Sequence, residues 1–394
     1  MASPTLKRSR DNPLSPNFLK RPKPSLHIDT SGRSLYYVAN FASRQLSLPA
    51  ISLPCLFSQC FEEARPEAEA VCILTQAAEK AVIDPLGAAC KGRLLVREGM
   101  KGTRMRGGLW LVQFSDRLRV AVTTAKLQQW DIKRLLHTIW VQDFPIGYSP
   151  CEFSFALARY VYSLIPPTDL EAQLAMNLAK FDFSGAAVDL IATIPGVYPA
   201  HIHLGLLQLA NTVPTGLPYS GLLASTTETM KDYSLLFGLQ VHLNLPKYTD
   251  ILIGYPSFQL VSESLYGLGG GGFAEPYGFT LDPGLYSDLS LKQSLSPSGC
   301  SALPGYNFLV LGGDMISEGD MVIYCGNHAF TSEDWGTDVG NGQWRYESHC
   351  VGVVFKRSSP EHTRQVLRSI PYALGERLDQ DHEPWQPRKH LLYL

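Results

Sequence analysis

The sequence lacks any run of 18 consecutive apolar residues, which is about the length that a helix needs to cross a lipid bilayer. Its first residues, MASPTLKRSRDNPLSPNF, carry charge but lack the apolar segment of a secretory signal. Hydrophobic residues make up 45% of the chain and charged residues 18%, values typical of globular proteins that exclude wholesale disorder. We therefore expect a soluble, intracellular, globular protein with no membrane partner.

Cysteine motifs are also missing. The eight cysteines are spread along the chain, no pair has CxxC spacing, and no cysteine–histidine cluster has the spacing of a zinc site. We interpret the cysteines as reduced and buried, and we predict neither a metal nor another cofactor.

Charge is unevenly distributed behind the formal net charge of −2. Residues 1–24 contain six basic side chains and one acidic side chain, whereas the remainder contains 28 basic and 35 acidic ones. This Pro- and Ser-rich head predicts a disordered basic arm. LKRSR followed by LKRPKP is typical of a nuclear-import signal, which predicts a nuclear protein with the import machinery as a partner. A weak nucleic-acid patch and a merely solvated tail are the alternatives.

The 394 residues are sufficient for two domains. Apolar runs predict strands at 70–74, 109–114, 118–125, 188–194, 250–255, 306–311, 321–325 and 350–355. Helical periodicity predicts helices at 151–164, 170–181 and 202–213. Strands and helices in both halves of the chain predict an α/β fold in which helices cover the sheets.

An internal repeat links the two halves. RVAVTTAK ends at Lys126 and is followed by Trp130, while MVIYCGN ends at Asn327 and is followed by Trp335. Each copy consists of a buried strand, two small residues, a polar residue able to contact an anion, and a tryptophan. The pattern suggests a duplication.

Several stretches, taken together, resemble the tyrosyl-DNA phosphodiesterase family, phospholipase D superfamily enzymes that remove topoisomerase tyrosine from a DNA 3′ end. The stretches occur in the family's order: GTRMRGGLWLVQFSDRLRVAVTTAKLQQWD (102–131), FDFSGAAVDLIATIPGVY (181–198), ILIGYPSFQLVSESLYGLGGGGF (251–273), MVIYCGNHAFTSEDWG (321–336) and CVGVVF (350–355). The resemblance implies two similar phospholipase D-like lobes, each a mixed β-sheet sandwiched between helices, related by a pseudo-twofold. It divides the chain into a disordered basic arm at 1–48, a first lobe at 49–200, a second lobe at 201–360 and a closing segment at 361–394.

The resemblance also implies a chemistry. In each lobe of the family a His-x-Lys pair lies on a strand and an Asn follows on the next strand. One histidine attacks phosphorus and the other protonates the departing tyrosine oxygen, while the Lys and Asn side chains hold the phosphoryl oxygens. The arrangement needs no metal.

The first His-x-Lys pair is absent from this sequence. In the two possible registers its positions fall on Met105 and Gly107, or on Arg106 and Gly108. Lys126 stands at the position of the first-lobe Asn.

The second pair is absent as well. The family's Pro-His-x-Lys pattern reads PGYN here, so that Gly305 and Asn307 stand at the His and Lys positions. Asn327 matches the family's second Asn. Loss of catalytic groups that act as a unit commonly costs about 10⁴- to 10⁶-fold in rate, and Gly305 has no side chain to substitute. The sequence therefore predicts a catalytically degenerate site.

Other histidines are not expected to replace the missing ones. His328 follows Asn327 at the end of a strand and should face the opposite side. His201 and His203, two residues apart on a helical stretch, should not share a face. We interpret all three as solvated or hydrogen-bonded structural histidines.

The remaining polar residues predict an anion site that binds without cutting. Arg106 can grip a phosphate with its guanidinium and Lys126 can act as a point charge. Asn307 and Asn327 can complete the set. The alternative is that both cations are ordinary surface or ion-paired residues.

We accordingly predict a nuclear, tyrosyl-DNA phosphodiesterase-like protein of DNA 3′-end repair, catalytically degenerate, whose ligand is a DNA 3′ end or single-stranded DNA. One alternative is an active DNA 3′-end phosphodiesterase with substituted or misaligned catalytic residues. Another is a non-enzymatic protein-interaction scaffold.

Overall fold

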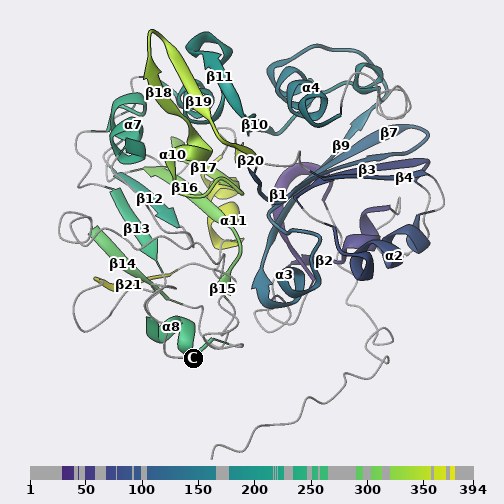
Figure 1. Ribbon diagram of the computed structural model, residues 1–394, viewed down its shortest axis with the longest axis horizontal. Coiled ribbons are helices and arrows are strands. Elements are labelled where there is room, and N and C mark those ends of the chain that lie inside the picture. Colours follow the sequence, from purple (N-terminus) through teal and green to yellow (C-terminus); the bar gives the residue numbers. More distant parts are fainter. Residues whose placement is uncertain are drawn as a thin grey trace, which may run out of the picture.

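The chain forms two lobes of mixed α/β structure, drawn from purple to blue-green on the right of Figure 1 and from green to yellow on the left. The computed structural model describes residues 29–39, 43, 49–57, 68–76, 78–90, 93–98, 104–165, 177–215, 217, 219, 221–225, 234–245, 251–255, 258–264, 290–295, 303–312, 320–355, 359–369 and 373–377.

The first lobe is built on a mixed sheet with the strand order β2-β1-β9-β7-β6-β3-β4. Its neighbouring strands are antiparallel except for the pairs β1–β2 and β3–β4, which are parallel. Apolar runs of β-branched and large residues form the central strands because such strands are buried on both faces; every residue of β3 is buried. The strands are β1 (Ser31–Val38), β2 (Ala50–Ile51), β3 (Ala70–Thr75), β4 (Arg93–Glu98), β6 (Gly108–Gln113), β7 (Arg117–Thr123) and β9 (Thr138–Pro145).

Helical segments cover both faces of this sheet. On one face α4 (Glu152–Leu164) buries Phe153, Leu157 and Tyr160, which lie on one side of the helix at the spacing that the sequence predicts. On the other face the 3-10 helix η2 (Leu53–Phe57) and α2 (Lys80–Ala89) cover a separate apolar cluster.

The second lobe is built on a sheet with the order β10-β20-β17-β16-β12-β13-β14-β21. The pairs β12–β13 and β13–β14 are parallel and the other neighbours on this path are antiparallel. The strands are β10 (Val188–Thr193), β12 (Gly221–Ser225), β13 (Ile251–Tyr255), β14 (Ser290–Leu295), β16 (Asn307–Gly312), β17 (Val322–Gly326), β20 (Ser348–Phe355) and β21 (Ala373–Arg377).

A smaller sheet of the order β11-β19-β18 stands at the upper edge of Figure 1. Its strands are β11 (Gly196–Pro199), β18 (Thr337–Gly340) and β19 (Gln343–Tyr346). The further helical segments are α3 (Gln129–Arg134), η3 (Leu178–Lys180), η4 (Ala200–Ile202), α6 (Gly205–Thr212), α7 (Ser234–His242), α8 (Phe258–Ser262), α10 (Ser332–Trp335) and α11 (Pro360–Ser369). No helix of the described residues is both long enough and apolar enough to span a membrane.

Each lobe contributes a short strand that pairs with a strand of the other lobe. β5 (Arg104–Met105), which precedes β6 in the first lobe, pairs in parallel with the start of β20 in the second lobe. In the reverse direction, β15 (Leu303–Pro304), which precedes β16, pairs in parallel with β8 (Leu135–Leu136), which precedes β9. The two lobes are therefore joined by backbone hydrogen bonds as well as by side-chain packing.

The predicted α/β architecture with mixed sheets is confirmed, but the lobes are divided differently from the predicted boundaries. β1 lies in the first sheet although it falls within 1–48, because its apolar residues Leu35–Tyr37 pair with β9. β10 belongs to the second sheet although it precedes residue 200, because it pairs with β20 along its whole length. β21, within 361–394, is a strand of the second sheet. Most of the predicted helix at 170–181 lies outside the described residues.

Candidate functional site

The strand registers reveal a pseudo-twofold between the lobes, which superimposes β6 and β7 on β16 and β17. Gly108 pairs with Thr123 at the end of the first hairpin, and Asn307 pairs with Gly326 at the end of the second. The backbone hydrogen bonds between the lobes follow the same pseudo-twofold. The Arg106 amide donates to the carbonyl of a β20 residue at 3.0 Å, and the Gly305 amide donates to the carbonyl of a β8 residue at 2.8 Å. The sequence repeat is therefore a structural repeat.

Thr124 is the first-lobe counterpart of Asn327. The side-chain oxygen Oγ1 of Thr124 accepts a hydrogen bond from the amide of Thr138 at 3.1 Å, and Oδ1 of Asn327 accepts one from the amide of Val351 at 2.9 Å. The alignment of Lys126 with Asn327 is thus displaced by two residues. The sequence repeat misled because it matched the two tryptophans, which do not occupy equivalent positions.

Two aspartates occupy the equivalent positions instead. Oδ2 of Asp131 accepts a hydrogen bond from the Lys126 amide, five residues earlier, at 2.8 Å. Oδ2 of Asp334 accepts one from the Ala329 amide, also five residues earlier and at 2.8 Å. Each carboxylate closes the turn between a strand and a short helix, α3 or α10, and both are buried. A buried carboxylate requires a cationic or hydrogen-bonding partner, and each of these has one.

Asp334 is paired with Arg106 across the lobe junction. Nε of Arg106 lies 2.6 Å from Oδ2 of Asp334, and both side chains are almost completely buried. The carboxylate therefore already neutralises the guanidinium that was predicted to meet an incoming phosphate. For Arg106 the structure therefore favours the alternative that this cation is an ordinary ion-paired residue.

The pseudo-twofold places Gly305 where Arg106 lies in the first lobe, and glycine offers Asp131 no partner. His137, between β8 and β9, supplies one: its Nε2 lies 3.0 Å from Oδ2 of Asp131. The imidazole fills the space beside Gly305, where a Cβ atom would lie 2.4 Å from Cε1 of His137. A residue from the first lobe thus occupies the place of the missing second-lobe side chain.

Both nitrogens of the His137 ring have neighbours. Nδ1 lies 3.2 Å from the Gly305 carbonyl and 3.2 Å from Oγ1 of Thr124, and Nε2 faces Asp131. Burial raises the pKa of Asp131, but His137 and Lys126 together outweigh burial and lower that pKa below its ordinary value. The imidazole is held on both sides, which suits a structural contact between the lobes better than attack on phosphorus.

The other predicted site residues surround this centre. Asn307 begins β16, and Asn327 follows β17 with Nδ2 close to the backbone of Gly107, whose φ is +64°. Among the described residues, neither Oδ1 of Asn307 nor Nδ2 of Asn327 has a hydrogen-bond partner, although both atoms are buried. Lys126 is half-buried at the edge of the centre, and Gly108 begins β6. The structure therefore brings the two asparagines to the junction, with Lys126 at its edge and Arg106 already paired with Asp334.

The alternative histidines have the structural roles expected of them. His328 is buried, bonds the Tyr324 hydroxyl through Nδ1, and packs against Trp335 with ring centroids 4.7 Å apart. Burial lowers the pKa of His328 to about 3. His201 and His203 are exposed. Among the residues that the structure describes, no group of acidic, histidine and cysteine side chains is arranged to hold a metal ion.

Sequence reasoning missed His137, Asp131, Asp334 and Thr124. The sequence did carry a signal for the two aspartates. Asp131 and Asp334 each lie after a buried strand and a turn, and each bonds the backbone amide of the residue five positions earlier. His137 had no signal of its own, since it lies outside the His-x-Lys pattern and reaches the centre only through the contact with Gly305.

Comparisons with known proteins agree with this architecture. Residues 105–229 match the sequence model of the family described as tyrosyl-DNA phosphodiesterase. A mutant of yeast tyrosyl-DNA phosphodiesterase 1 superimposes with a TM-score of 0.64 at 11% sequence identity, covering 83% of this chain and 90% of that one. Yeast tyrosyl-DNA phosphodiesterase superimposes with a TM-score of 0.63 at 11% identity, covering 85% and 91%. No curated protein sequence matches the chain.

The structural likeness, at this low identity, shows the fold, and the match over residues 105–229 includes Arg106, Gly108, Thr124, Asp131 and His137 of the junction. Residues 105–229 thus match the sequence model of the tyrosyl-DNA phosphodiesterase family, and the chain as a whole has the fold of the solved yeast tyrosyl-DNA phosphodiesterase structures.

Proposed function

We propose that this protein is a catalytically degenerate tyrosyl-DNA phosphodiesterase-like protein that acts in DNA 3′-end repair by binding rather than by hydrolysis. The observation that carries the proposal is the composition of the junction. Arg106, Gly108, Gly305 and Asn307 stand at the pseudo-equivalent positions, and His137 fills the space at Gly305 with both ring nitrogens engaged. Covalent phosphoryl transfer needs a nucleophile with a free lone pair directed at phosphorus, and this arrangement does not present one.

We infer that Lys126, rather than Arg106, contacts the DNA. Arg106 is buried and paired with Asp334, whereas Lys126 is partly exposed at the edge of the junction. A point charge there can meet a terminal phosphate without breaking a buried ion pair. The proposal also retains the two-lobed organisation, with the second lobe beginning before β10, and a nuclear location directed by the basic residues of 1–24.

The activity test is incubation of the full chain with a 3′-phosphotyrosyl oligonucleotide, with yeast tyrosyl-DNA phosphodiesterase as the positive control. We expect no release of tyrosine above background. Release that disappears in His137→Gln would instead favour the alternative of an active enzyme with a substituted histidine.

The binding test is titration of a single-stranded oligonucleotide with a 3′-phosphate at two salt concentrations. Phosphate contacts predict weaker binding at the higher salt. Lys126→Glu should abolish the binding, while Lys80→Glu, an exposed lysine at the start of α2, should leave it unchanged. Absence of binding at low salt would favour the interaction scaffold, and equal loss in both variants would remove Lys126 from the proposal.

A further inference from the structure

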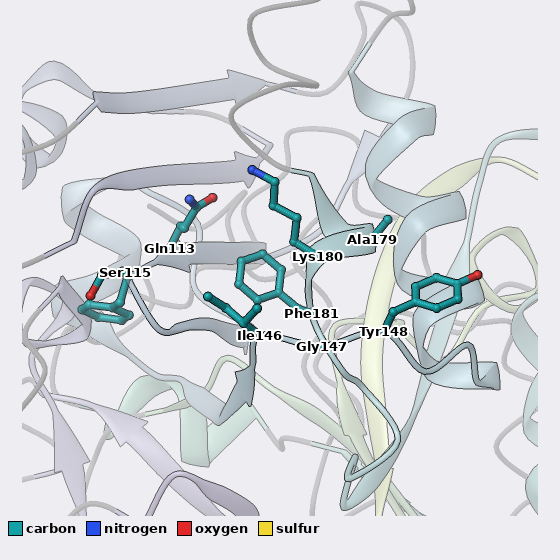
Figure 2. Close-up of a pocket in the computed structure, with 9 residues that line it drawn as sticks. Gln113, Ser115, Ile146, Gly147, Tyr148, Ala179, Lys180 and Phe181 are labelled. Carbon is teal, nitrogen blue, oxygen red and sulfur yellow. The ribbon is translucent and has the colours of Figure 1, made fainter.

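A cavity of about 440 Å³ lies in the first lobe, away from the lobe junction. Gln113, at its edge, is five residues along β6 from Gly108, which corresponds to about 17 Å at the rise of a β-strand. Figure 2 shows the residues that line it, from the β6–β7 turn, the segment after β9, and η3. They include Gln113, Ile146, Gly147, Tyr148, Lys180 and Phe181.

Backbone hydrogen bonds fix the frame of this cavity. The amide of Gly147 donates to the carbonyl of Lys180 at 2.9 Å, and the amide of Ile146 donates to the carbonyl of Asp116 at 3.2 Å. Ile146 also forms an isolated β-bridge with Phe181. The cavity is therefore formed before any ligand arrives, as small-molecule sites generally are.

Large apolar side chains are unusually exposed at this site. Ile146 is 61% exposed and Tyr148 is 76% exposed, beside the buried ring of Phe181. Single exposed apolar residues need no explanation, but an apolar surface that lines a cavity and is flanked by polar groups is typical of a binding site.

Two polar side chains enter the same cavity. The Gln113 amide and the Lys180 ammonium lie on the same side of it, above Ile146 and Phe181 in the view of Figure 2. Within the described part of the chain, neither side chain has a hydrogen bond or an ion pair. Neither nearby carboxylate forms an ion pair with Lys180, because Asp116 pairs with Arg117 and Asp182 accepts from the Ser184 amide. Lys180 therefore brings to the cavity an ammonium group that has no ion-pair partner among the described residues.

We propose that this cavity binds a nucleotide, which goes beyond the function proposed for the lobe junction. The exposed apolar surface of Ile146, beside the Phe181 ring, receives the flat base, since apolar contact tolerates any base. The carboxamide of Gln113 offers a donor and an acceptor side by side, which match the edge of a base. Lys180 meets the phosphate as a point charge. A base without a phosphate would leave Lys180 without a contact, and a phosphate without a base would leave the apolar surface and Gln113 without one.

Calorimetric titration of the full chain with adenosine 5′-monophosphate, adenosine and inorganic phosphate tests the proposal. We expect the nucleotide to bind more tightly than either of its parts. Lys180→Ala should weaken the nucleotide about tenfold, the loss of one charge-assisted hydrogen bond, and leave adenosine unchanged. Gln113→Leu should weaken the nucleotide and adenosine alike. Lys80→Ala is the matched control and should change nothing.

A short oligoadenylate identifies the source of the nucleotide. Binding tighter than that of the monophosphate indicates a strand, and equal or weaker binding indicates a free nucleotide; both results support a nucleotide site. The proposal is overturned if the nucleotide does not bind, if phosphate alone binds as well, or if Lys180→Ala has no effect. Lys126→Glu should leave this binding intact, so that failure at the cavity and failure at the junction are distinguishable.

Discussion

We predict that His137 takes the place of a side chain at residue 305. The prediction can be tested by introducing at 305 the arginine that the pseudo-twofold places at residue 106. Arg106 reaches Asp334 from the position that is equivalent to Gly305, so an arginine at 305 should reach Asp131 in the same way. His137 blocks it, since even a Cβ atom at 305 would lie 2.4 Å from the imidazole. Removal of His137 should therefore make Gly305→Arg tolerable.

The magnitudes follow from the burial of the pair. His137→Ala removes the imidazole partner of the buried Asp131 carboxylate and leaves it only the Lys126 amide. Loss of one member of a buried pair typically costs about 3–5 kcal/mol of the free energy of unfolding. Gly305→Arg in the presence of His137 overfills the junction, for which about 1–3 kcal/mol is typical. Independent effects would sum, whereas in the double variant the arginine occupies the vacated space and pairs with Asp131. We expect the double variant to be more stable than His137→Ala alone.

Chemical denaturation of the four proteins measures this coupling as a double-mutant cycle. A matched control combines Gly305→Arg with His349→Ala, another buried histidine near the junction, whose atoms are not among those nearest to a Cβ at residue 305, and should be additive. If the His137→Ala and Gly305→Arg effects add to within about 0.5 kcal/mol, residue 137 does not stand in for residue 305 and the reasoning from the pseudo-twofold fails.

Three further predictions concern the same region. Burial lowers the pKa of His349 to about 4 from an unfolded value of 6.5, so the unfolded chain binds the proton first and stability should fall by about 3 kcal/mol as the pH drops from 6.5 to 4. His349→Phe should flatten this pH dependence in denaturation curves. Arg106→Leu should cost about 3–5 kcal/mol by stranding Asp334, and adding Asp334→Asn should recover part of that loss. Gly107→Ala, at a φ of +64° and with no room for a Cβ, should cost about 2–4 kcal/mol, whereas Gly185→Ala, with nothing within 4 Å, should be neutral; thermal unfolding compares the two.

Much of the fold was predictable because its signal is local. The apolar runs that form β3, β6, β7, β17 and β20 are long enough to identify buried strands without knowledge of their partners. Their assignment to sheets depends on pairing between distant segments, and this is where the prediction failed. β10 precedes the predicted boundary yet pairs with β20, some 160 residues later in the chain.

At the site, the sequence shows which of the expected histidine and lysine side chains are absent, but not which residues take their place. Glycine at 305 and the absence of histidine near 106 can be read directly from the residues. The compensating contacts could not be, because Asp131, His137 and Asp334 form no linear motif and meet their partners only through the register of the sheets. Lys126 was misplaced by two residues for the same reason, since the turn that follows β7 is defined by the aspartate rather than by the tryptophan.

The two-residue strands β5 and β15 have a consequence for how the protein must be assembled. Because β5 completes an edge beside β20 and β15 completes one beside β8, neither half of the polypeptide carries all the hydrogen-bonding partners that it needs. Expression of the halves as separate genes should give insoluble or partly unfolded products, while their co-expression should allow them to complement each other. The reciprocal pairing of β5 and β15 thereby makes the two lobes a single unit that cannot be divided without loss of hydrogen-bonding partners on both sides.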